Sequence, residues 1–575
     1  MSAKKQNKKI PIIVVFSLIA IVVFITMLTN LLRPEAYSDR QAKLAEVYSA
    51  KEGSAAIIVN GRKTDVRATI KNHHAYLPLR KVVDEINSCF YYSNIDKTLL
   101  YTSALEVVTA GRKDTYDEAP IFYDSEEGKA DSKTALYDRI YVLLDYVACY
   151  TNIQVDYYTA PDRVFIRSRY GSKTEYALVS GGLAMRREPS ISADIITYLQ
   201  DGEKLWLAEQ IDESWYLAYI GGTHGHAGYV NVEDLKEKET VIDKGDYITP
   251  NYTRIALDEP IRLAWHQMLY DSGLESIEGY LPDAEGANII VPTWFSVEGS
   301  DGTISSRAKQ EYVNYVQNHG KHVWALVENF NTTNKLDYDR LLGKASSRAQ
   351  MIETLISESQ RCGIEGINVD FEGLPSSAGT SYIQFLRELS VECRKAGIIL
   401  SVDNYVPSAW TSFYDRGEQG KFVDYFVIMA YDEHYAGTEA GSTASLPFVK
   451  KGIDDTIAEG VPADKIIVGV PFFARVWSGE GSKLTSETIG MEDMKELRDQ
   501  HESGTSWDDE AAQYYTEYKS EDKLKRIWSE STESLDAKLE LISHYGVCGV
   551  AGWKLGMEDP EAWTIIKNYF PTPEA

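Results

Sequence analysis

Polar and apolar residues alternate along one short segment, GIEGINVDFEGL, at residues 363–374. Residues two apart in a strand share a face, so Asn368, Asp370 and Glu372 point one way and the apolar residues between them point the other. An acidic group in a buried strand is costly unless it is paired or used. A carboxylic acid near a second carboxylate in a semi-enclosed site has a raised pKa, which keeps it protonated until it donates its proton. The alternation therefore predicts that these polar groups form one functional line on a single face of the strand.

The segments around this strand predict the fold of the domain that carries it. From about residue 254, apolar strands alternate with helices. The strands are predicted at IRLAWHQM, NIIVPTWFSV, HVWALVENF, GIEGINVDFEG, GIILSVDNYVP, FVDYFVIMAYD, KIIVGVPFFARVW and GVAGWKLG. Eight such units favour a (β/α)8 TIM barrel over an open doubly wound sheet. No GxGxxG or GxxxxGK(S/T) follows any of these strands, so the sequence does not support a nucleotide-binding fold.

Several of these strands end in polar or aromatic residues. Barrel active sites lie at the C-terminal rim of the strands. The residues that the strand ends bring there are Glu328, Asn329, Asp403, Asn404, Tyr431, Asp432, Arg475 and Trp553. A purely structural barrel has no reason to gather such groups at one end, so we expect them to surround the acidic line.

Two of the motifs resemble those of a known family. EGINVDFE resembles the DxxDxDxE signature of glycoside hydrolase family 18, the chitinase-type barrel, and IMAYD resembles the MxYD strand of that family. A tryptophan on the last strand, as in AGWKLG, also fits. Within the family, the Asn at the second motif position and the IMAYDEH segment are most similar to those of the spore-cortex and peptidoglycan N-acetylglucosaminidases.

The resemblance implies a role for each matching residue. Glu372 would be the general acid, Asp370 would orient the N-acetyl group of the substrate, and Tyr431 would hydrogen-bond to the carbonyl of that group. The acetamido oxygen then attacks the anomeric carbon and replaces the second carboxylate of other retaining glycosidases. The predicted substrate-binding residues are Asn368, Asp432, Met429, Trp553, Glu328, Asn404 and Arg475. No metal or cofactor is implied.

The sequence departs from the family signature at two positions. Glu365 takes the place of the first Asp, but it lies out of phase with the acidic line and is expected only to support the strand. Asn368 removes a charge that would interact with Asp370, so the pH profile should differ from that of a chitinase with three acids.

The N-terminus predicts a membrane anchor. Four lysines within residues 1–9 precede an apolar run at residues 10–32, which is long enough to cross a ~30 Å hydrocarbon layer. Positive residues place the short side, 1–9, in the cytoplasm. A cleaved signal peptide is the alternative, but its apolar core is usually shorter and ends in an A-x-A-like site, which does not follow this run. We expect a single-pass protein of the cell membrane with its C-terminal bulk outside.

An internal repeat follows a polar stalk at residues 33–54. Within residues 55–170, AYLPLRKVVDEI and FYYSNIDKTLLYTS can be laid on IYVLLDYVACYT and VDYYTAPDRVFIRS at a constant offset of 141 − 76 = 65. Each copy is predicted as a short helix followed by two strands, which indicates two packed copies of one α+β unit. The first copy, with IIVNGRK and LPLR, resembles the copper-amine-oxidase N-terminal-like module, and the name implies no copper here.

Residues 175–236 predict a small all-β barrel, because short alternating strands are separated by turn residues. LAMRREPS, DGEKL, SWYLAY and HAGYV resemble the bacterial SH3-type wall-binding domain. That resemblance implies contact with peptidoglycan or its peptides, or a role as a spacer. The TIM barrel is expected to occupy residues 252–575.

The charge of the chain excludes one class of partner. A net charge of −27 over 575 residues argues against nucleic acid, which needs a concentrated basic surface. The five cysteines are scattered without a CxxC pair, so a zinc site or a dense disulfide framework is not expected, and a bridge between Cys89 and Cys149 stays open. No pattern specifies the oligomeric state.

Together these features predict a membrane-anchored extracellular glycoside hydrolase that cleaves peptidoglycan after N-acetylglucosamine. A chitinase or an endo-β-N-acetylglucosaminidase acting on chitin or N-glycans would share every residue of the site. A catalytically silent carbohydrate-binding barrel is the alternative from another class. Such barrels typically lack the acid, whereas Asp370, Glu372 and Tyr431 are all present.

Overall fold

The computed structural model describes residues 36–110, 120–123, 133–168, 171–179, 181–245, 247, 250–268, 273–330 and 335–573. These form two compact units. The N-terminal unit contains the described residues up to 86, 120–123 and those from 138 to 247. The barrel unit contains the described residues of 87–110, 133–137 and 250–573.

A closed parallel barrel forms the centre of the barrel unit, as predicted. Each strand pairs in parallel with the next, and pairing of the last strand with the first closes the ring. The strands are β18 (Ile261–His266), β19 (Ile289–Val297), β21 (His322–Glu328), β22 (Gly366–Asp370), β23 (Ile399–Tyr405), β24 (Tyr425–Met429), β25 (Ile466–Pro471) and β31 (Gly549–Trp553). Nearly every residue of these strands is buried, and most are apolar, because both faces of the sheet are covered.

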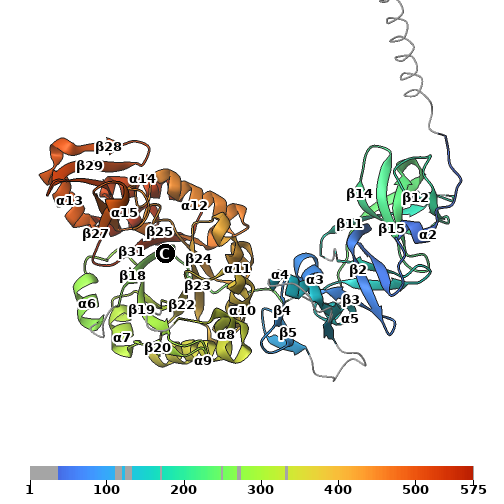
Figure 1. Cartoon of the computed structure of the whole chain (residues 1–575), viewed down its shortest axis with the longest axis horizontal. Helices are drawn as coiled ribbons and strands as arrows, with labels where there is room; N and C mark the ends of the chain where they lie inside the picture. The colour runs from blue at the N-terminus through green and yellow to red at the C-terminus, as the bar shows by residue number, and fades with distance from the viewer. Residues whose placement is uncertain are drawn as a thin grey trace, which may run out of the picture. The chain divides into compact units, whose positions relative to one another are not determined.

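Helices surround the strands, and Figure 1 looks into the ring that they form. They are α6 (Gly273–Tyr280), α7 (Gln310–Asn318), α8 (Tyr338–Gly343), α9 (Ala345–Cys362), α10 (Gly379–Ala396), α11 (Arg416–Phe422), α12 (Leu446–Ala458), α14 (Thr532–Ser543) and α15 (Glu561–Tyr569). The helices α9 and α10 end at Gly363 and Gly397, whose φ angles of 75° and 69° let the chain turn directly into β22 and β23.

The seventh predicted strand is divided in the structure. Its first part is β25 of the barrel, and its second part, β26 (Phe473–Ser478), starts a separate antiparallel sheet in the order β27-β26-β30-β29-β28. The other strands of that sheet are β27 (Thr485–Gly490), β28 (Thr505–Asp508), β29 (Gln513–Ser520) and β30 (Lys523–Ser529), and α13 (Met491–Gln500) packs with them. A subdomain is therefore inserted between the last two barrel strands.

A small sheet from the first repeat packs on the outside of the barrel. It contains β4 (Phe90–Ser93), β5 (Thr98–Thr102) and β6 (Val107–Ala110) and contacts α10. The Tyr91 hydroxyl lies 3.0 Å from Ser381 Oγ, and Gln384 Nε2 donates to Thr102 Oγ1 over 2.8 Å. All four of these side chains are buried.

The N-terminal unit holds two seven-stranded sheets. The first has the order β7-β8-β3-β2-β1-β10-β9. It contains β1 (Ser54–Val59), β2 (Arg62–Lys71), β3 (His74–Pro78), β7 (Ile121–Tyr123), β8 (Ile140–Leu143), β9 (Gln154–Tyr158) and β10 (Arg163–Arg167), with α3 (Leu79–Glu85) and α5 (Leu144–Cys149) after β3 and β8. The helix α4 (Lys133–Arg139) precedes β8.

The repeat has a two-fold arrangement in this sheet. β3 and β8 pair antiparallel with Leu77 opposite Val142, and these residues are equivalent under the offset of 65. A local two-fold axis therefore relates the two copies of the repeat at this strand pair. Their hairpins then separate: the hairpin of the second copy, β9–β10, stays beside β1, while that of the first, β4–β5, groups with the barrel unit.

The second sheet covers most of the segment predicted as a small all-β domain, and its order is β13-β12-β16-β15-β14-β11-β17. Its strands are β11 (Lys173–Val179), β12 (Ala184–Arg186), β13 (Ile195–Tyr198), β14 (Lys204–Gln210), β15 (Trp215–Ile220), β16 (His226–Asn231) and β17 (Leu235–Ile242). All neighbours that pair do so antiparallel, and the sheet encloses its own apolar core. The short helix α2 (Leu44–Val47) packs against that core.

The predicted location in the cell membrane is corrected here. Among the residues that the structure describes, no helix combines the length and the apolar character needed to cross a membrane. The segment at residues 10–32, on which the prediction rested, lies outside the described residues. We therefore withdraw the membrane location and membrane attachment.

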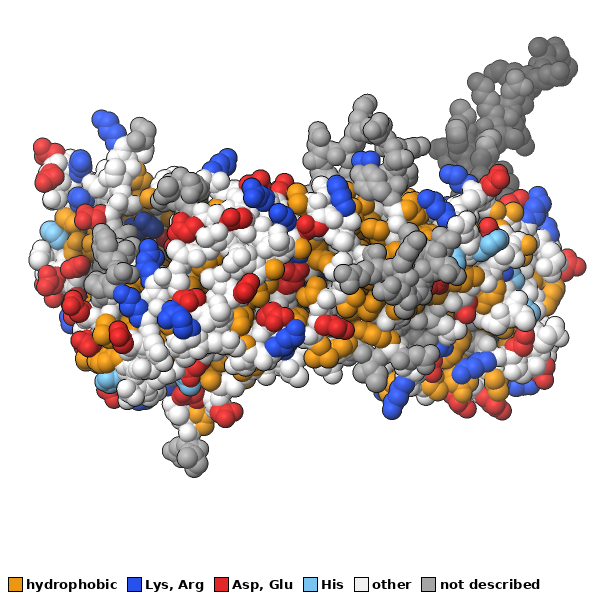
Figure 2. Space-filling model, turned by 90° about the horizontal axis from the view of Figure 1, so that it is seen from below, with side chains coloured by type: hydrophobic (Ala, Val, Ile, Leu, Met, Phe, Trp, Pro, Cys, Tyr) orange, Lys and Arg blue, Asp and Glu red, His pale blue; other side chains and the backbone are white. Residues whose placement is uncertain are grey.

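On the face drawn in Figure 2, acidic and basic side chains are interspersed over the described residues.

All five cysteines are free, with Cys362 and Cys393 buried as small apolar side chains. The bridge between Cys89 and Cys149 is not formed.

Candidate active site

The end of β22 is fixed by hydrogen bonds to its backbone. Asn329, just beyond β21, accepts from the Glu372 N–H over 2.8 Å and donates to the Glu372 carbonyl over 2.8 Å. The same Asn329 amide donates to the Tyr338 hydroxyl over 2.7 Å. One residue earlier, the Tyr414 hydroxyl donates to the Phe371 carbonyl over 2.9 Å. These hydrogen bonds fix the backbone on both sides of the Glu372 Cα atom. The direction in which the Glu372 side chain leaves the backbone is therefore set before any ligand binds.

The Glu372 carboxyl has a raised pKa. Burial is the main cause, the hydrogen bond from Tyr405 opposes it, and the negative charges of Asp432 and Glu328 add to it. The Tyr405 hydroxyl also accepts from the Gly373 N–H over 3.2 Å, so it is held against the strand end. A carboxylic acid in this setting stays protonated to a higher pH than an ordinary glutamic acid, as a proton donor requires.

Asp370, two residues earlier, is almost fully buried at 6% exposure. Its Oδ1 has no hydrogen-bond donor within reach among the described residues. Its pKa is raised well above the usual value, first by burial and then by the charges of Glu372, Asp403 and Glu328. A buried carboxylate oxygen without a donor is costly, and a ligand N–H would remove that cost.

Asn368 forms the layer below. It is fully buried, its Oδ1 accepts from Trp265 Nε1 over 3.2 Å, and its Nδ2 donates to Ser401 Oγ over 2.9 Å and to Asp403 Oδ1 over 2.7 Å. Burial raises the pKa of Asp403 to about 8, and the bond from Asn368 only partly offsets this. Asn368 therefore connects three neighbouring side chains beneath Asp370 and does not reach the open end of the barrel.

Tyr431 and Met429 lie at the end of β24. Met429 is buried, and Tyr431 is partly buried against the barrel core, with its ring edge-to-face to Phe473 at 6.1 Å. Gly469 makes room for the tyrosine, because a Cβ at that position would lie 3.2 Å from the Tyr431 ring. The pKa of Tyr431 is raised well above its usual value by burial and by the nearby carboxylates, first Asp403 and then Asp370. Its hydroxyl therefore remains a proton donor.

Two indole rings meet at the last strand. Trp553, at the end of β31, packs at 60° against Trp265, with 5.7 Å between ring centroids. Trp265 is buried, whereas Trp553 is only partly buried. The peptide bond from Trp553 to Lys554 is cis. The part of the Trp553 ring that is not buried is an apolar surface, and the buried ring of Trp265 packs against Trp553.

Three further predicted residues are charged. Arg475 Nη2 pairs with Asp432 Oδ1 over 2.9 Å, which joins the end of β24 to the inserted sheet, because Arg475 lies on β26 rather than on a barrel strand. Glu328 ends β21, where its Oε1 accepts from Ser296 Oγ over 2.8 Å. Burial raises the pKa of Glu328.

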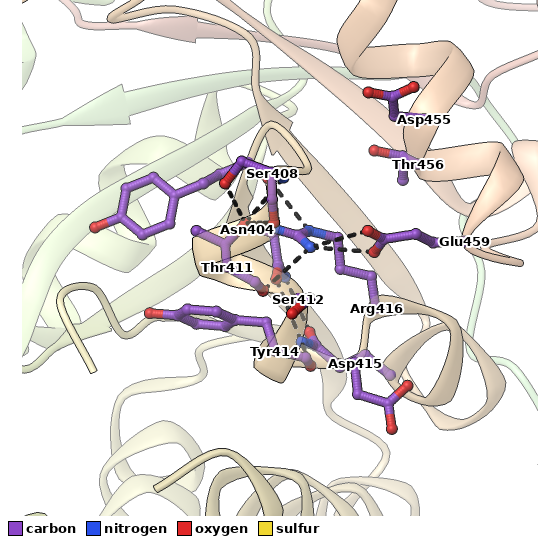
Figure 3. A network of polar contacts seen from close by, with 12 residues as sticks. Asn404, Ser408, Thr411, Ser412, Tyr414, Asp415, Arg416, Asp455, Thr456 and Glu459 are labelled. Atoms are coloured by element: carbon purple, nitrogen blue, oxygen red, sulfur yellow. Dashed lines mark hydrogen bonds and ion pairs between the residues drawn. The ribbon is translucent and has the colours of Figure 1, made fainter. Parts of the chain in front are cut away.

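Asn404 is the predicted residue that the structure does not bring to the site. It lies between Asp403 and Tyr405 on β23 and therefore points to the helix side, where it is buried and exchanges hydrogen bonds with Gln419 of α11 at 2.9 and 3.3 Å. Figure 3 shows Asn404 beside the polar network around Arg416. The alternation of side chains along a strand is the physical reason for this correction.

The network in Figure 3 supports the loop after β23. The buried Arg416 guanidinium donates to Thr411 Oγ1 over 2.8 Å and to the Tyr405 carbonyl over 3.3 Å, and it pairs with Glu459 over 3.1 Å. On the loop that it holds, Trp410 is 65% exposed and lies 5.4 Å from the Tyr405 ring. An exposed indole therefore stands beside the residue that contacts Glu372.

The structure also places Asp403, Tyr405 and Asn329 around the candidate site, although the sequence assigned none of them a role there. Asp403 and Asn329 were recognised only as polar strand ends, and Tyr405 was not singled out. The signal for two of them was present in SVDNY, because Ser401, Asp403 and Tyr405 share one strand face. The role of Asn329 depends on how far β21 extends beside β22, which no local pattern shows.

A closed parallel barrel with carboxyl groups of raised pKa at the C-terminal ends of its strands has the arrangement of a glycoside-hydrolase site. The model of the family described as glycosyl hydrolases family 18 matches residues 268–558, half of the chain. The chain belongs to this family and is a glycosidase of the chitinase type.

Individual relatives agree with this assignment. The chain is 25% identical over 293 residues to the uncharacterized glycosylase YvbX of Bacillus subtilis (strain 168), covering 49% of this chain and 84% of the relative. It is 24% identical over 239 residues to a cortical fragment-lytic enzyme of the same organism, covering 40% of this chain but only 55% of the relative. The crystal structure of the spore cortex-lytic enzyme SleL of Bacillus cereus matches with a TM-score of 0.50 and 19% identity, covers 60% of this chain and 78% of that one, and supports the fold alone.

Proposed function

We propose that this glycosidase cleaves the β-1,4 bond after N-acetylglucosamine in the glycan strands of peptidoglycan, with retention of configuration and with the substrate as its own nucleophile. One observation carries the mechanism: Asp370 Oδ1 is a buried acceptor without a donor among the described residues, two positions from a proton donor. The N–H of an acetamido group is the donor that would satisfy it. The name of the cortical fragment-lytic relative supports the polymer.

The reaction then uses few groups. The Glu372 O–H gives its proton to the glycosidic oxygen as the bond from that oxygen to C1 breaks. The acetamido oxygen closes on C1, while Asp370 accepts the N–H and the Tyr431 hydroxyl donates to that oxygen to orient it. The Glu372 carboxylate next removes a proton from water, which attacks C1 and reopens the ring with retention.

Other residues would bind or position the sugar. Trp553 provides a floor beneath the reacting ring, and the exposed Trp410 provides a second stacking surface beside Glu372. The pair Asp432 and Arg475 would contact sugar hydroxyls at the rim. We assign Asn368 a positioning role, because it is fully buried and already bonded to three side chains.

The resemblances in the N-terminal unit are part of the proposal. A copper-amine-oxidase N-terminal-like repeat and an SH3-like wall-binding domain ahead of the barrel would place the enzyme beside wall polymer. Chitin and N-glycan cores carry the same N-acetylglucosamine unit, and the test must therefore separate these substrates.

The test is digestion of purified sacculi with the full chain, followed by mass spectrometry of the reduced products. We expect N-acetylglucosamine at the new reducing ends, faster release from sacculi than from chitin oligomers, and loss of release in Glu372→Gln by a factor of at least about 10³. The control Glu439→Gln changes an exposed carboxylate in the loop between β24 and α12 and should leave release unchanged. Reducing-end N-acetylmuramic acid would overturn the bond assignment, and an active Glu372→Gln would overturn the mechanism.

A further inference from the structure

A cavity lies in the N-terminal unit, and none of its lining residues belongs to the candidate glycosidase site. Its volume is about 350 Å³, within the range of about 300–1,000 Å³ that small-ligand sites occupy. Its walls come from β9 and β10 of the first sheet, from β14 and β15 of the second, and from the loop at residues 221–224. Both sheets of the unit therefore contribute to one pocket.

The strand register decides which side chains face this cavity. Gln154 and Asp156 share a face of β9, and they stand opposite Arg167 and Phe165 on β10. From the second sheet, Trp206 on β14 stands opposite Tyr219 on β15, and their rings stack at 6.5 Å and 18°. The cavity thus has an aromatic wall facing a polar one.

Two charges at this cavity lack a partner of opposite sign. Lys204 Nζ lies 3.6 Å from the Tyr176 ring centroid and 4.5 Å from that of Trp206, and no carboxylate of the described residues pairs with it. Asp156 accepts only from the Gln154 amide, at 3.1 and 3.3 Å, and no cation of the described part of the chain pairs with it.

The other charged groups of the wall are already paired. Arg167 lies over the Trp206 ring at 4.6 Å and pairs with Asp243 over 3.1 Å. Glu203 contacts His224 Nε2 over 2.9 Å. An uncompensated cation and an uncompensated anion therefore line the same cavity, and a ligand with both charges would complement them.

The cavity is built on a rigid junction. Arg163 is 5% exposed and donates to the Gly225 carbonyl over 2.6 Å and to the His224 carbonyl over 2.8 Å, which fixes the loop to β10. A Cβ at Gly61 would lie 2.9 Å from the Tyr219 ring, so the two sheets approach as closely as glycine allows. Such a pocket exists before its ligand arrives, which lowers the entropy cost of binding.

We propose that this cavity binds a small zwitterion, an amino acid or a short peptide, with its carboxylate toward Lys204, its ammonium toward Asp156 and its side chain against Trp206. The proposal is independent of the glycosidase function. Free amino acids, L-peptides and wall peptides that contain D-amino acids share this chemistry, and the ligand series below distinguishes them.

The test is isothermal titration of the full chain with D-alanyl-D-alanine, L-alanyl-L-alanine and free alanine. We expect at least one to bind. The N-acetylated and the C-amidated forms of that ligand should each bind at least about tenfold more weakly, because each lacks one charge. Preference for the D,D dipeptide indicates a wall peptide, and preference for the L,L form or alanine indicates another source.

Variants locate the binding. Lys204→Met and Asp156→Asn should each weaken binding by about tenfold. Lys238→Met is the matched control, because Lys238 lies 4.3 Å over the Tyr216 ring in the same sheet but does not line the cavity. Release of sugar from sacculi by the barrel should not change in any of the three. Absence of binding by all three zwitterions, equal binding of the blocked forms, or unchanged binding in Lys204→Met and Asp156→Asn would refute the proposal.

Discussion

Replacement of Asp403 by asparagine should make the barrel less sensitive to alkaline pH. Asp403 is 2% exposed and accepts from Asn368 Nδ2, and an asparagine side chain can keep that bond through its own oxygen. Its pKa is raised from 3.8 to about 8, mainly by burial. Between these values the folded protein keeps a proton that the unfolded chain loses, so the free energy of unfolding falls as the pH rises from about 4 to about 8.

The magnitude follows from the same pKa. At about 1.4 kcal/mol for each tenfold change in proton affinity, the loss in the free energy of unfolding above pH 8 is at most about 6 kcal/mol. Asp370 and Glu372 titrate together with Asp403, so removing one carboxyl should recover about 2 to 5 kcal/mol. Asp403→Asn should therefore have about the same free energy of unfolding as the wild type near pH 4. Above pH 4 the variant should be the more stable protein, by a difference that grows up to pH 8.

Urea unfolding at several pH values, followed by tryptophan fluorescence, measures this difference. Nine of the eleven tryptophans lie in the barrel unit, so the signal reports mainly on the barrel. Asp509→Asn, at an exposed position, serves as the control. A difference between Asp403→Asn and wild type that stays constant from pH 4 to pH 9, or that falls as the pH rises, would refute the reasoning.

Three other substitutions test neighbouring parts of the site. Tyr405→Phe removes the hydrogen bond that lowers the Glu372 pKa, so the alkaline limb of kcat/KM against pH should move upward by up to about one pH unit, and a downward move would contradict this. Trp410→Ala should raise KM by about fivefold to tenfold with little change in kcat, whereas an unchanged KM for sacculi would exclude stacking there. Asn368→Asp adds a buried acid beside Asp403, so its Tm should fall by several degrees more at pH 8 than at pH 5, and an equal loss at both would contradict the argument.

The barrel could be predicted from the sequence because its strands are buried on both faces. Strands of that kind are continuous apolar runs, and all eight predicted runs contain a barrel strand. The split of KIIVGVPFFARVW into β25 and β26 was missed because Pro471 and Phe472 do not interrupt the apolar run. Only the pairing partners distinguish the two strands: β25 joins the barrel and β26 an antiparallel sheet.

How much of the candidate site the sequence could indicate depended on whether the residues lie on one face of a single strand. Asp370 and Glu372 follow from alternation within a single strand. Asn404 was chosen as a polar strand end without asking which face it occupies, and its neighbour Asp403 has the inward position. Asn329 clamps the Glu372 backbone through a contact between strands, which depends on tertiary structure.

Because the small sheet packs on α10, the barrel cannot be exchanged between proteins as a self-contained domain without that sheet. A truncated chain that begins at Tyr252 would keep all eight barrel strands but lose β4, β5 and β6. The buried Gln384 would lose Thr102, and Ser381 would lose Tyr91. Exchange of the barrel at a boundary just before Tyr252 would therefore break packing within the barrel unit rather than cut a linker.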